Sequence, residues 1–262
     1  MPPWIDLKDA KRALAEGTGK GIRVAVLDSG VEASHPKLGI TLLDDLAVVA
    51  EGHKLRVVKG GGRDTFGHGT AVAGVIHELA PQAKIGSIRV LGHDNTSRTS
   101  IIERAAQEAL DRGYHIINCS FGCGVENQVL QYKKWVDEAY LKGIHIVAAC
   151  DNIDFSKTEW PACFPSVVAV NMAETDDGKI FYYQRGTLVE FAARGVNVPV
   201  LWAGGAEKVV TGSSFAAPRL SAMLARLLSG CPNVTPLEAK AIFHKLALPW
   251  THKVAAQNVM IG

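Results

Sequence analysis

Short apolar runs that are rich in β-branched residues alternate with longer amphipathic stretches along this chain. The apolar runs have the length of strands, and the amphipathic stretches repeat apolar side chains at helical spacing. The first of these segments, alternately strand and helix, are residues 22–27, 70–79, 85–90 and 100–112. The pattern therefore predicts consecutive strand–helix units, which build a parallel sheet.

The same alternation continues through the middle of the chain, in residues 115–118, 125–141, 144–149 and 166–170. Each predicted strand is an unbroken apolar run, which is typical of a strand with helices on both of its faces. The sequence therefore predicts an α/β fold with a doubly wound, mostly parallel β-sheet and helices on both faces.

The remaining segments depart from this alternation. Residues 179–191 are predicted to form an antiparallel excursion, and residues 214–229 a helix. A last helix is predicted to begin at Thr235, because a proline follows it and Glu238 stands three residues later, as in a capping box. Residues 41–63, which contain three consecutive glycines, are predicted to form irregular surface structure.

Composition supports one sizeable globular domain. Of the 262 residues, 47% are hydrophobic and 21% charged, which excludes a disordered, collagen-like or disulfide-scaffold protein. No internal repeat or linker divides the chain, and we predict a single domain over residues 1–262. The 28 basic and 26 acidic residues give a net charge of +2 without long basic runs, which argues against a nucleic-acid partner.

Membrane, targeting and disulfide signals are all weak in this sequence. The longest apolar stretches are much shorter than the ~18 residues of a membrane span, so no membrane partner is expected. Neither a signal peptide nor a propeptide is visible, and we expect cytoplasmic localisation. Five cysteines, an odd number, favour reduced thiols over a disulfide framework. The sequence carries no signal for the oligomeric state.

Three segments place reactive side chains at the ends of predicted strands and helices, where functional groups gather in open parallel sheets. Asp28 ends the first strand before a glycine turn, where aspartate also occurs as a turn residue or a ribose ligand. His68 opens a helix between two glycines that leave its imidazole unobstructed, although a lone histidine is often structural. Ser214 stands in the first turn of an apolar helix, where many serines act as N-caps.

Together, Asp28, His68 and Ser214 supply an acid, a base and a hydroxyl nucleophile within one α/β domain. In this order along the chain they make the sequence resemble the subtilisin-like serine proteases of the subtilase family. The resemblance implies that Ser214 attacks the scissile carbonyl, His68 moves the proton, and Asp28 orients and stabilises the imidazole. The matching blocks extend over nearly the whole chain and are residues 28–30, 34–36, 68–74, 80–81, 90–91, 117–122, 146–149, 164–167 and 211–218.

The oxyanion donor of this family is an asparagine that follows a strand, small residues and a glycine. Counted without a gap from residue 143, Asn152 takes that position and Asp151 replaces the glycine. A register shifted by one residue would place Asp151 there instead, and its carboxylate would suppress ordinary hydrolysis. We predict Asn152 as the oxyanion donor.

The resemblance also implies where a substrate binds. Ser120, Phe121 and Gly122 are expected to form an edge that pairs with an extended peptide, main chain to main chain. The alternative for these three residues is an ordinary loop after a buried strand.

Glu159 stands just before Trp160 and Pro161, at the place that forms the floor of the pocket for the residue before the scissile bond in this family. A partly shielded carboxylate at this place would favour a Lys or Arg side chain in the substrate. The alternative is that Glu159 points to solvent, where Lys157 faces it, and that apolar walls determine the selectivity.

No cofactor or metal is expected, because the helix after His68 has no room for the calcium-binding loop of secreted family members and no His/Cys spacing is typical of zinc. We expect a serine endopeptidase that acts on peptide or protein substrates as a narrow-specificity intracellular processing protease, or as a peptide-maturation protease or transpeptidase. Asp151 suggests a catalytically impaired peptide-binding subunit as the alternative. A dinucleotide-binding enzyme is disfavoured, because no glycine fingerprint follows Gly30.

Overall fold

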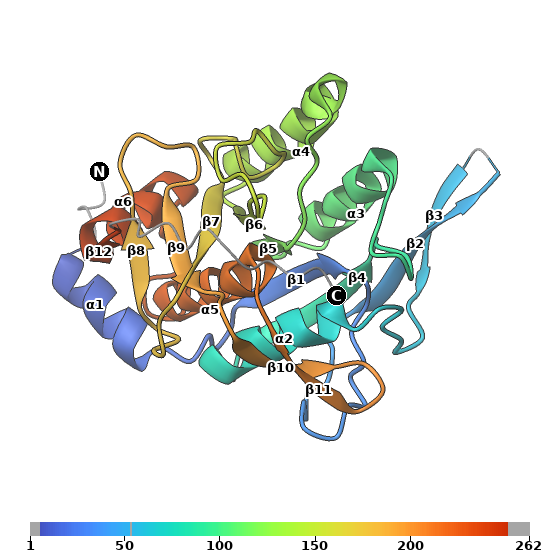
Figure 1. Ribbon diagram of the computed structural model, residues 1–262, viewed down its shortest axis with the longest axis horizontal. Coiled ribbons are helices and arrows are strands. Elements are labelled where there is room, and N and C mark those ends of the chain that lie inside the picture. The colour runs from blue at the N-terminus through green and yellow to red at the C-terminus, as the bar shows by residue number, and fades with distance from the viewer. Residues whose placement is uncertain (1–5, 53, 251–262) are drawn as a thin grey trace.

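A ten-stranded sheet forms the middle layer of the structure, a computed structural model that describes residues 6–52 and 54–250 (Figure 1). Its central strands are parallel, and they are the five strands that the apolar runs predict, with slightly shifted ends. They are β1 (Arg23–Asp28), β4 (Lys84–Arg89), β5 (Ile116–Cys119), β6 (His145–Ala149) and β7 (Val168–Ala173).

The order of the strands explains where functional side chains meet. The sheet has the order β12-β8-β9-β7-β6-β5-β1-β4-β2-β3. Since β1 lies between β4 and β5, the chain first adds strands on one side of β1 and later adds strands on the other side. In a parallel sheet, such a switch point opens a crevice at the carboxyl ends of the strands. Asp28 is the last residue of β1 and lies at this point.

The prediction of irregular structure for residues 41–63 is wrong. β2 (Asp45–Glu51) and β3 (Lys54–Lys59) form an antiparallel hairpin that extends the sheet beyond β4 and projects from the body of the protein (Figure 1). Much of the hairpin is exposed, so its strands do not carry the fully apolar runs that mark the central strands. The three glycines at 60–62 follow β3 and do not interrupt it.

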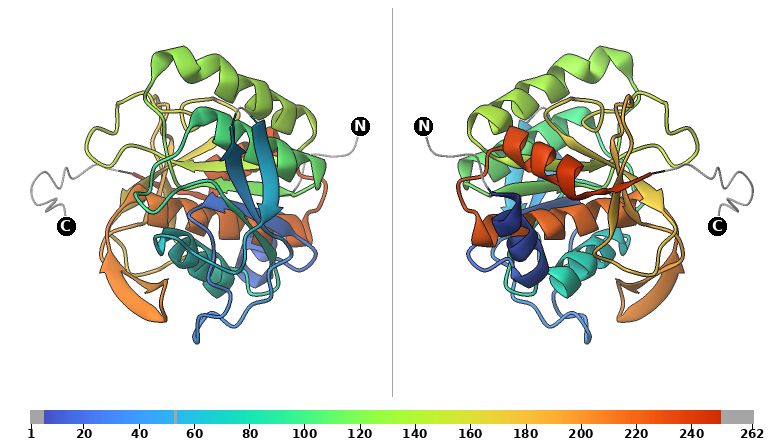
Figure 2. Two further views of the ribbon diagram at one scale, coloured as in Figure 1. Left: turned by 90° about the vertical axis from the view of Figure 1, so that its right-hand side faces the viewer. Right: turned by 90° about the vertical axis from the view of Figure 1, so that its left-hand side faces the viewer.

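Helices cover both faces of the sheet, as the sequence predicts (Figure 2). One face carries two helices, α3 (Thr99–Asp111) and α4 (Val129–Leu141), the second preceded by a 3₁₀ turn (Glu126–Gln128). The other face carries four, namely α1 (Leu7–Glu16), α2 (His68–Leu79), α5 (Ser213–Gly230) and α6 (Pro236–Leu246).

The two apolar cores follow from the alternation of side chains along each strand. In β1, Val24 and Val26 point into the core that contains α2 and α5, and Ala25 and Leu27 point into the core beneath α3 and α4. A strand that is buried on both faces has to be apolar at every position, which explains the unbroken runs in the sequence.

A buried arginine ties α2 to α5. Arg226, near the end of α5, donates to the carbonyl oxygens of Leu14 and Leu79 at 2.7 Å each, and also to the carbonyl of Ala15. These carbonyls lie at the ends of α1 and α2, where the helices leave them without partners of their own. The two helices whose first turns carry predicted site residues are therefore fixed relative to each other.

The remaining elements lie at the edges of the fold. The predicted antiparallel excursion is confirmed, because β8 (Phe181–Tyr183) pairs antiparallel with β9 (Phe191–Arg194). The predicted capping box of α6 is also confirmed, since Thr235 and Glu238 cap each other's backbone. Neither α1 nor the β10–β11 hairpin was predicted from the sequence. In this hairpin, β10 (Val198–Trp202) pairs antiparallel with β11 (Ala206–Val210), and at the edge of the large sheet β12 (Leu248–Pro249) pairs with β8.

Two further observations concern the described part of the chain. Within it, no helix combines the length and the apolar character needed to cross a membrane. The five cysteines all carry free thiols.

Candidate active site

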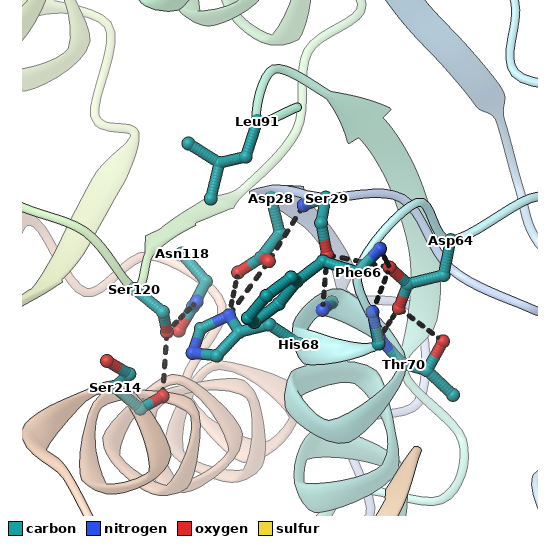
Figure 3. Close-up of polar contacts among 12 residues, drawn as sticks. Asp28, Ser29, Asp64, Phe66, His68, Thr70, Leu91, Asn118, Ser120 and Ser214 are labelled. Atoms are coloured by element: carbon teal, nitrogen blue, oxygen red, sulfur yellow. Dashed lines mark hydrogen bonds and ion pairs between the residues drawn. The ribbon is translucent and has the colours of Figure 1, made fainter. Parts of the chain in front are cut away.

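Asp28 and His68 form a buried pair at the carboxyl end of β1 (Figure 3). The Nδ1 atom of His68 lies 2.8 Å and 3.0 Å from the two carboxylate oxygens of Asp28. The Oδ1 atom of Asp28 also accepts the backbone N–H of Ser29 at 2.8 Å. Because its carboxylate is directed at an imidazole, Asp28 is neither a simple turn residue nor a ribose ligand in this structure.

His68 is the first residue of α2, and its flanking glycines have a packing role that the sequence analysis did not foresee. Gly67 has a φ of 113°, which favours glycine, and a Cβ atom there would lie 2.1 Å from the Nε1 atom of Trp202. A Cβ atom on Gly69 would lie 2.0 Å from the carbonyl oxygen of Gly30. The glycines therefore allow neighbouring segments to approach the helix, and this close approach buries His68.

Three effects act on the pKa of His68. Burial lowers it, but the charge and hydrogen bonds of Asp28, together with the charge of Asp64, outweigh burial and raise the pKa above its ordinary value. Because Asp28 accepts the proton on Nδ1, the second ring nitrogen is left as the basic one. This nitrogen faces the start of α5, where Ser214 lies (Figure 3).

Ser214 is not the N-cap of α5. The cap position belongs to Gly212, and Ser214 is the second residue of the helix. The phenyl ring of Phe215 packs against the imidazole of His68, with ring centroids 5.1 Å apart. The structure therefore brings the start of α5 directly against the Asp28–His68 pair.

Hydrogen bonds from both sides hold the first turn of α5. The hydroxyl of Ser213 donates to the carbonyl oxygen of Cys150 at 2.6 Å, and its N–H donates to the Oδ1 atom of Asn152 at 2.7 Å. The hydroxyl of Ser120 donates to the carbonyl oxygen of Ser214 at 2.9 Å. The segments after β5 and β6 thus fix the position of Ser214.

Asn152 lies against the start of α5, and its bond to the N–H of Ser213 orients its amide group. Since Oδ1 accepts the N–H of Ser213, the Nδ2 atom points away from that bond, and among the described residues no acceptor binds it. A Cβ atom on Gly212, the N-cap residue of α5, would lie 3.5 Å from Nδ2, so the amide lies close to the N-terminus of this helix. This arrangement leaves an N–H donor free for an oxyanion formed at Ser214.

Asp151, the other candidate for the oxyanion position, has its carboxylate bound within its own loop. Its Oδ1 atom accepts the N–H groups of Ile153 and Asp154 at 2.8 Å each, and its Oδ2 atom lies 3.0 Å from the ammonium of Lys157. Burial alone would raise the pKa of Asp151, but these hydrogen bonds and the charge of Lys157 lower it overall. The geometry favours the register in which Asn152 is the donor.

In the segment after β5, Phe121 and Gly122 form no backbone–backbone hydrogen bond with another described residue. Phe121 and Gly122 belong to no strand, and only at Cys123 does the chain pair with Trp160, through two hydrogen bonds of 2.9 Å. Ser120 is buried and anchors this segment to α5. An extended peptide can therefore add to this edge as a further strand.

Glu159 combines features of both sequence interpretations. Its side chain is only 12% exposed and covers Gly122, where a Cβ atom would lie 2.4 Å from Oε2. The ammonium of Lys157 faces it at 3.6 Å, as the alternative interpretation expects. Burial and the charge of Asp151 raise the pKa of Glu159, and Lys157 opposes them. Glu159 does not point to solvent, and it lies beside the predicted peptide-binding edge.

The sequence analysis missed a buried polar chain that supports the site. The hydroxyl of Ser221 donates to the Oδ1 atom of Asn118 at 2.8 Å, and the Nδ2 atom of Asn118 donates to the hydroxyl of Ser120 at 2.9 Å. The signal was present, because Asn118 interrupts an apolar strand and Ser221 an apolar helix. Buried polar residues at such places need partners.

The described residues contain no group of three or more His, Cys, Asp or Glu side chains that could hold a metal ion.

Comparisons with known proteins agree with this geometry. Residues 19–258 match the Subtilase family. Subtilisin BL from Lederbergia lenta is 30% identical over 242 residues, which cover 88% of this chain and 86% of the relative. M-protease from Shouchella clausii is 30% identical over 242 residues, which cover 88% of this chain and 60% of that protein.

Solved structures show the same fold. The crystal structure of a cold-adapted subtilisin-like serine proteinase superposes on this chain with a TM-score of 0.73 at 24% sequence identity. The match covers 88% of this chain and 83% of the other. The predicted subtilisin-like α/β fold is therefore confirmed.

The raised pKa of His68 predicts the pH dependence of activity. A base accepts a proton only in its neutral form, so we expect kcat/KM for peptide hydrolysis to rise with pH through an acid limb above pH 6.5, the ordinary value for histidine. Initial rates on one fluorogenic peptide, recorded from acid to alkaline pH, measure this limb. A limb below pH 6.5 would contradict the assigned balance of charges around His68.

The orientation of Asn152 predicts a loss that is confined to turnover. We expect Asn152→Ala to lower kcat by about 10²–10³, the loss typical of an oxyanion donor, with little change in KM. Asp151→Ala serves as the matched control and is expected to have a smaller effect, because its carboxylate faces Lys157. If Asn152→Ala left kcat unchanged and Asp151→Ala lowered it strongly, the register would be shifted by one residue and Asp151 would occupy the oxyanion position.

Proposed function

This chain belongs to the subtilase family of serine endopeptidases, and we propose that it cleaves extended peptides with Ser214 as nucleophile, His68 as base and Asp28 as the group that orients it. The observation that carries the proposal is the buried contact between Asp28 and the Nδ1 atom of His68, with the start of α5 on the other side of the ring. Asn152 completes the site as the proposed oxyanion donor.

Each step of the proposed reaction uses one of these groups. The hydroxyl oxygen of Ser214 attacks the scissile carbonyl carbon while its proton passes to the free ring nitrogen of His68. Asp28 stabilises the imidazolium, and the amide of Asn152 donates to the oxyanion. His68 then gives the proton to the leaving amine. A water molecule, activated by the same histidine, hydrolyses the acyl-enzyme.

The proposed substrate is a peptide that lies along Ser120–Phe121–Gly122 and carries Lys or Arg before the cleaved bond. Its ammonium or guanidinium would reach Glu159, a shielded carboxylate that lies 3.6 Å from the ammonium of Lys157. Charge-assisted hydrogen bonds in a shielded place are strong enough to select a substrate side chain. Narrow specificity of this kind suits a processing protease.

We further propose that the enzyme works in the cytoplasm. The five free thiols support this location, since a reducing compartment keeps such thiols unpaired. Fractionation of cells that express the natural gene tests it, and recovery of the protein from the medium would contradict it.

The alternative of an impaired peptide-binding subunit loses its main support. It was suggested by a carboxylate beside the oxyanion position, but the carboxylate of Asp151 is bound by two backbone N–H groups and by Lys157. These bonds occupy the carboxylate within its own loop and partly compensate its charge.

Replacement of Ser214 tests the proposed nucleophile. We expect Ser214→Ala to keep its fold and to lose about 10⁶ in turnover, the magnitude typical of a lost serine nucleophile in such a triad. A fluorophosphonate probe should label the wild type and the control variant Ser156→Ala, which changes an exposed serine, but not Ser214→Ala. Retention of most of the activity by Ser214→Ala would remove it from the triad.

Charge reversal at Glu159 tests the proposed specificity. We expect Glu159→Lys to lower kcat/KM on peptides with Lys or Arg before the cleaved bond far more than on neutral peptides, because the new ammonium repels the substrate. Lys157→Met should act in the opposite direction, since it removes the competing ammonium. Asp154→Asn, at an exposed position on the same loop, is the control for net charge.

Parallel assays of the four enzymes on basic and neutral peptides measure these effects. Equal losses on both kinds of peptide, or a wild-type preference for Phe or Leu, would remove Glu159 from the pocket.

A further inference from the structure

Helix α2, which starts with His68, has no cap of its own. The N-cap position is taken by Gly67, which has no side chain to accept the N–H groups of the first turn. No other residue fits at this position, because a Cβ atom would collide with Trp202. The close packing that buries His68 therefore leaves its helix in need of acceptors from outside.

Asp64 supplies the acceptor for one N–H group of the first turn, that of Thr70, and binds the segment that leads into the helix (Figure 3). Its Oδ1 atom accepts the N–H groups of Gly67 at 2.6 Å and Phe66 at 3.0 Å, and also the hydroxyl of Ser29 at 2.7 Å. Its Oδ2 atom accepts the N–H of Thr70 at 2.8 Å and the hydroxyl of the same residue at 2.6 Å. All five donors are neutral, and no ion pair joins Asp64 to a described cation.

Ser29 connects this cap to the other half of the site. Its hydroxyl donates to Asp64 and accepts the N–H of Gly69 at 3.0 Å, and its carbonyl oxygen accepts the N–H of Thr65 at 3.0 Å. Ser29 directly follows Asp28. The end of β1 with Asp28 and the first turn of α2 with His68 are therefore joined through one carboxylate and one hydroxyl.

The charge of Asp64 also acts on His68. An imidazolium at the first position of a helix lies at the positive end of the helix dipole, which disfavours it. The described segments that pack around the ring contribute two charged groups that raise the pKa of His68, Asp28 from β1 and Asp64 from the loop before α2. From α5 the uncharged ring of Phe215 packs against the imidazole, and from β10 the uncharged Trp202 lies against Gly67.

We propose that Asp64 is a second functional carboxylate of the active site, a positioning residue that caps α2 from outside, holds His68 in register with Asp28 and stabilises the imidazolium formed during turnover. The inference rests on the proposed role of His68 as the base. It assigns to Asp64 a function that Asp28 cannot fulfil, because Asp28 orients the ring but leaves the first turn of α2 uncapped.

The test compares Asp64→Asn with Asp64→Glu, which keeps the charge. Asp64→Asn should lower kcat and move the acid limb of the kcat/KM profile to lower pH. Asp64→Glu should lower kcat but leave the acid limb at the pH of the wild type. Ser29→Ala, which removes a hydrogen-bonding group but no charge, should also leave the limb in place. Asp137→Asn on the exposed face of α4 is the control for net charge and should match the wild type.

A second readout does not depend on turnover. The imidazole of His68 can be titrated by NMR in Ser214→Ala and in the double variant that adds Asp64→Asn, and the midpoint should be lower in the double variant. This separates the two proposals. If Ser214 proves not to be the nucleophile, the titration still measures the effect of Asp64, and a shift in the titration alone supports it.

The inference is overturned if Asp64→Asn lowers kcat but leaves both the acid limb and the NMR midpoint where they are in the wild type, because Asp64 is then a structural cap only. If Asp64→Asn does not fold, Asp64→Ser takes its place, since it keeps a short oxygen acceptor before α2 and removes the charge. The proposal then expects the acid limb and the NMR midpoint to move to lower pH, and unshifted values of both overturn it.

Discussion

The structure depends on one buried contact, that between the carboxylate of Asp28 and the imidazole of His68. Asp28 is fully buried and His68 is 5% exposed, so water does not solvate the carboxylate and reaches the imidazole only at its exposed edge. A buried carboxylate is stable when hydrogen bonds and an opposite charge compensate it, and Asp28 receives the N–H of Ser29 and the Nδ1 atom of His68. The contact requires β1 to end and α2 to begin within hydrogen-bonding distance, which makes the surrounding glycines necessary.

The position of α5 is the second constraint, because it sets where Ser214 lies relative to this pair. Three groups of hydrogen bonds control this position. Residues that follow β5 and β6 bind the first turn of α5, Asn118 binds Ser221 in its middle, and Arg226 near its other end binds a carbonyl oxygen at the end of α2. A helix buried along most of its length has few ways to shift without opening a cavity. The site is thus assembled by the central helix of the core and not by a surface loop.

The central sheet could be predicted from the sequence because it follows a local rule, in which unbroken apolar runs indicate strands that are buried on both faces. The family could be predicted from the order of Asp28, His68 and Ser214 along the chain, whereas the catalytic roles of these residues stay a prediction. The β2–β3 hairpin was missed because it is only partly buried, so its pattern is not that of a core strand. The roles of Asp64 and Asn118 were missed because they depend on neighbours far apart in sequence, such as Ser29 for Asp64 and Ser221 for Asn118. Contacts of this kind are visible only after folding.

The charges near the proposed oxyanion position would connect the proposed specificity with catalysis. Asp151 and Glu159 carry two negative charges against the single ammonium of Lys157, so this side of the proposed pocket is net negative when both carboxylates are ionised. A net negative surrounding opposes the oxyanion that forms beside Asn152. A cationic substrate side chain at Glu159 would cancel this charge, and the benefit is greatest in the transition state, when the oxyanion is present. Basic substrates would then be favoured in kcat as well as in binding, since an interaction that is stronger in the transition state accelerates the chemical step.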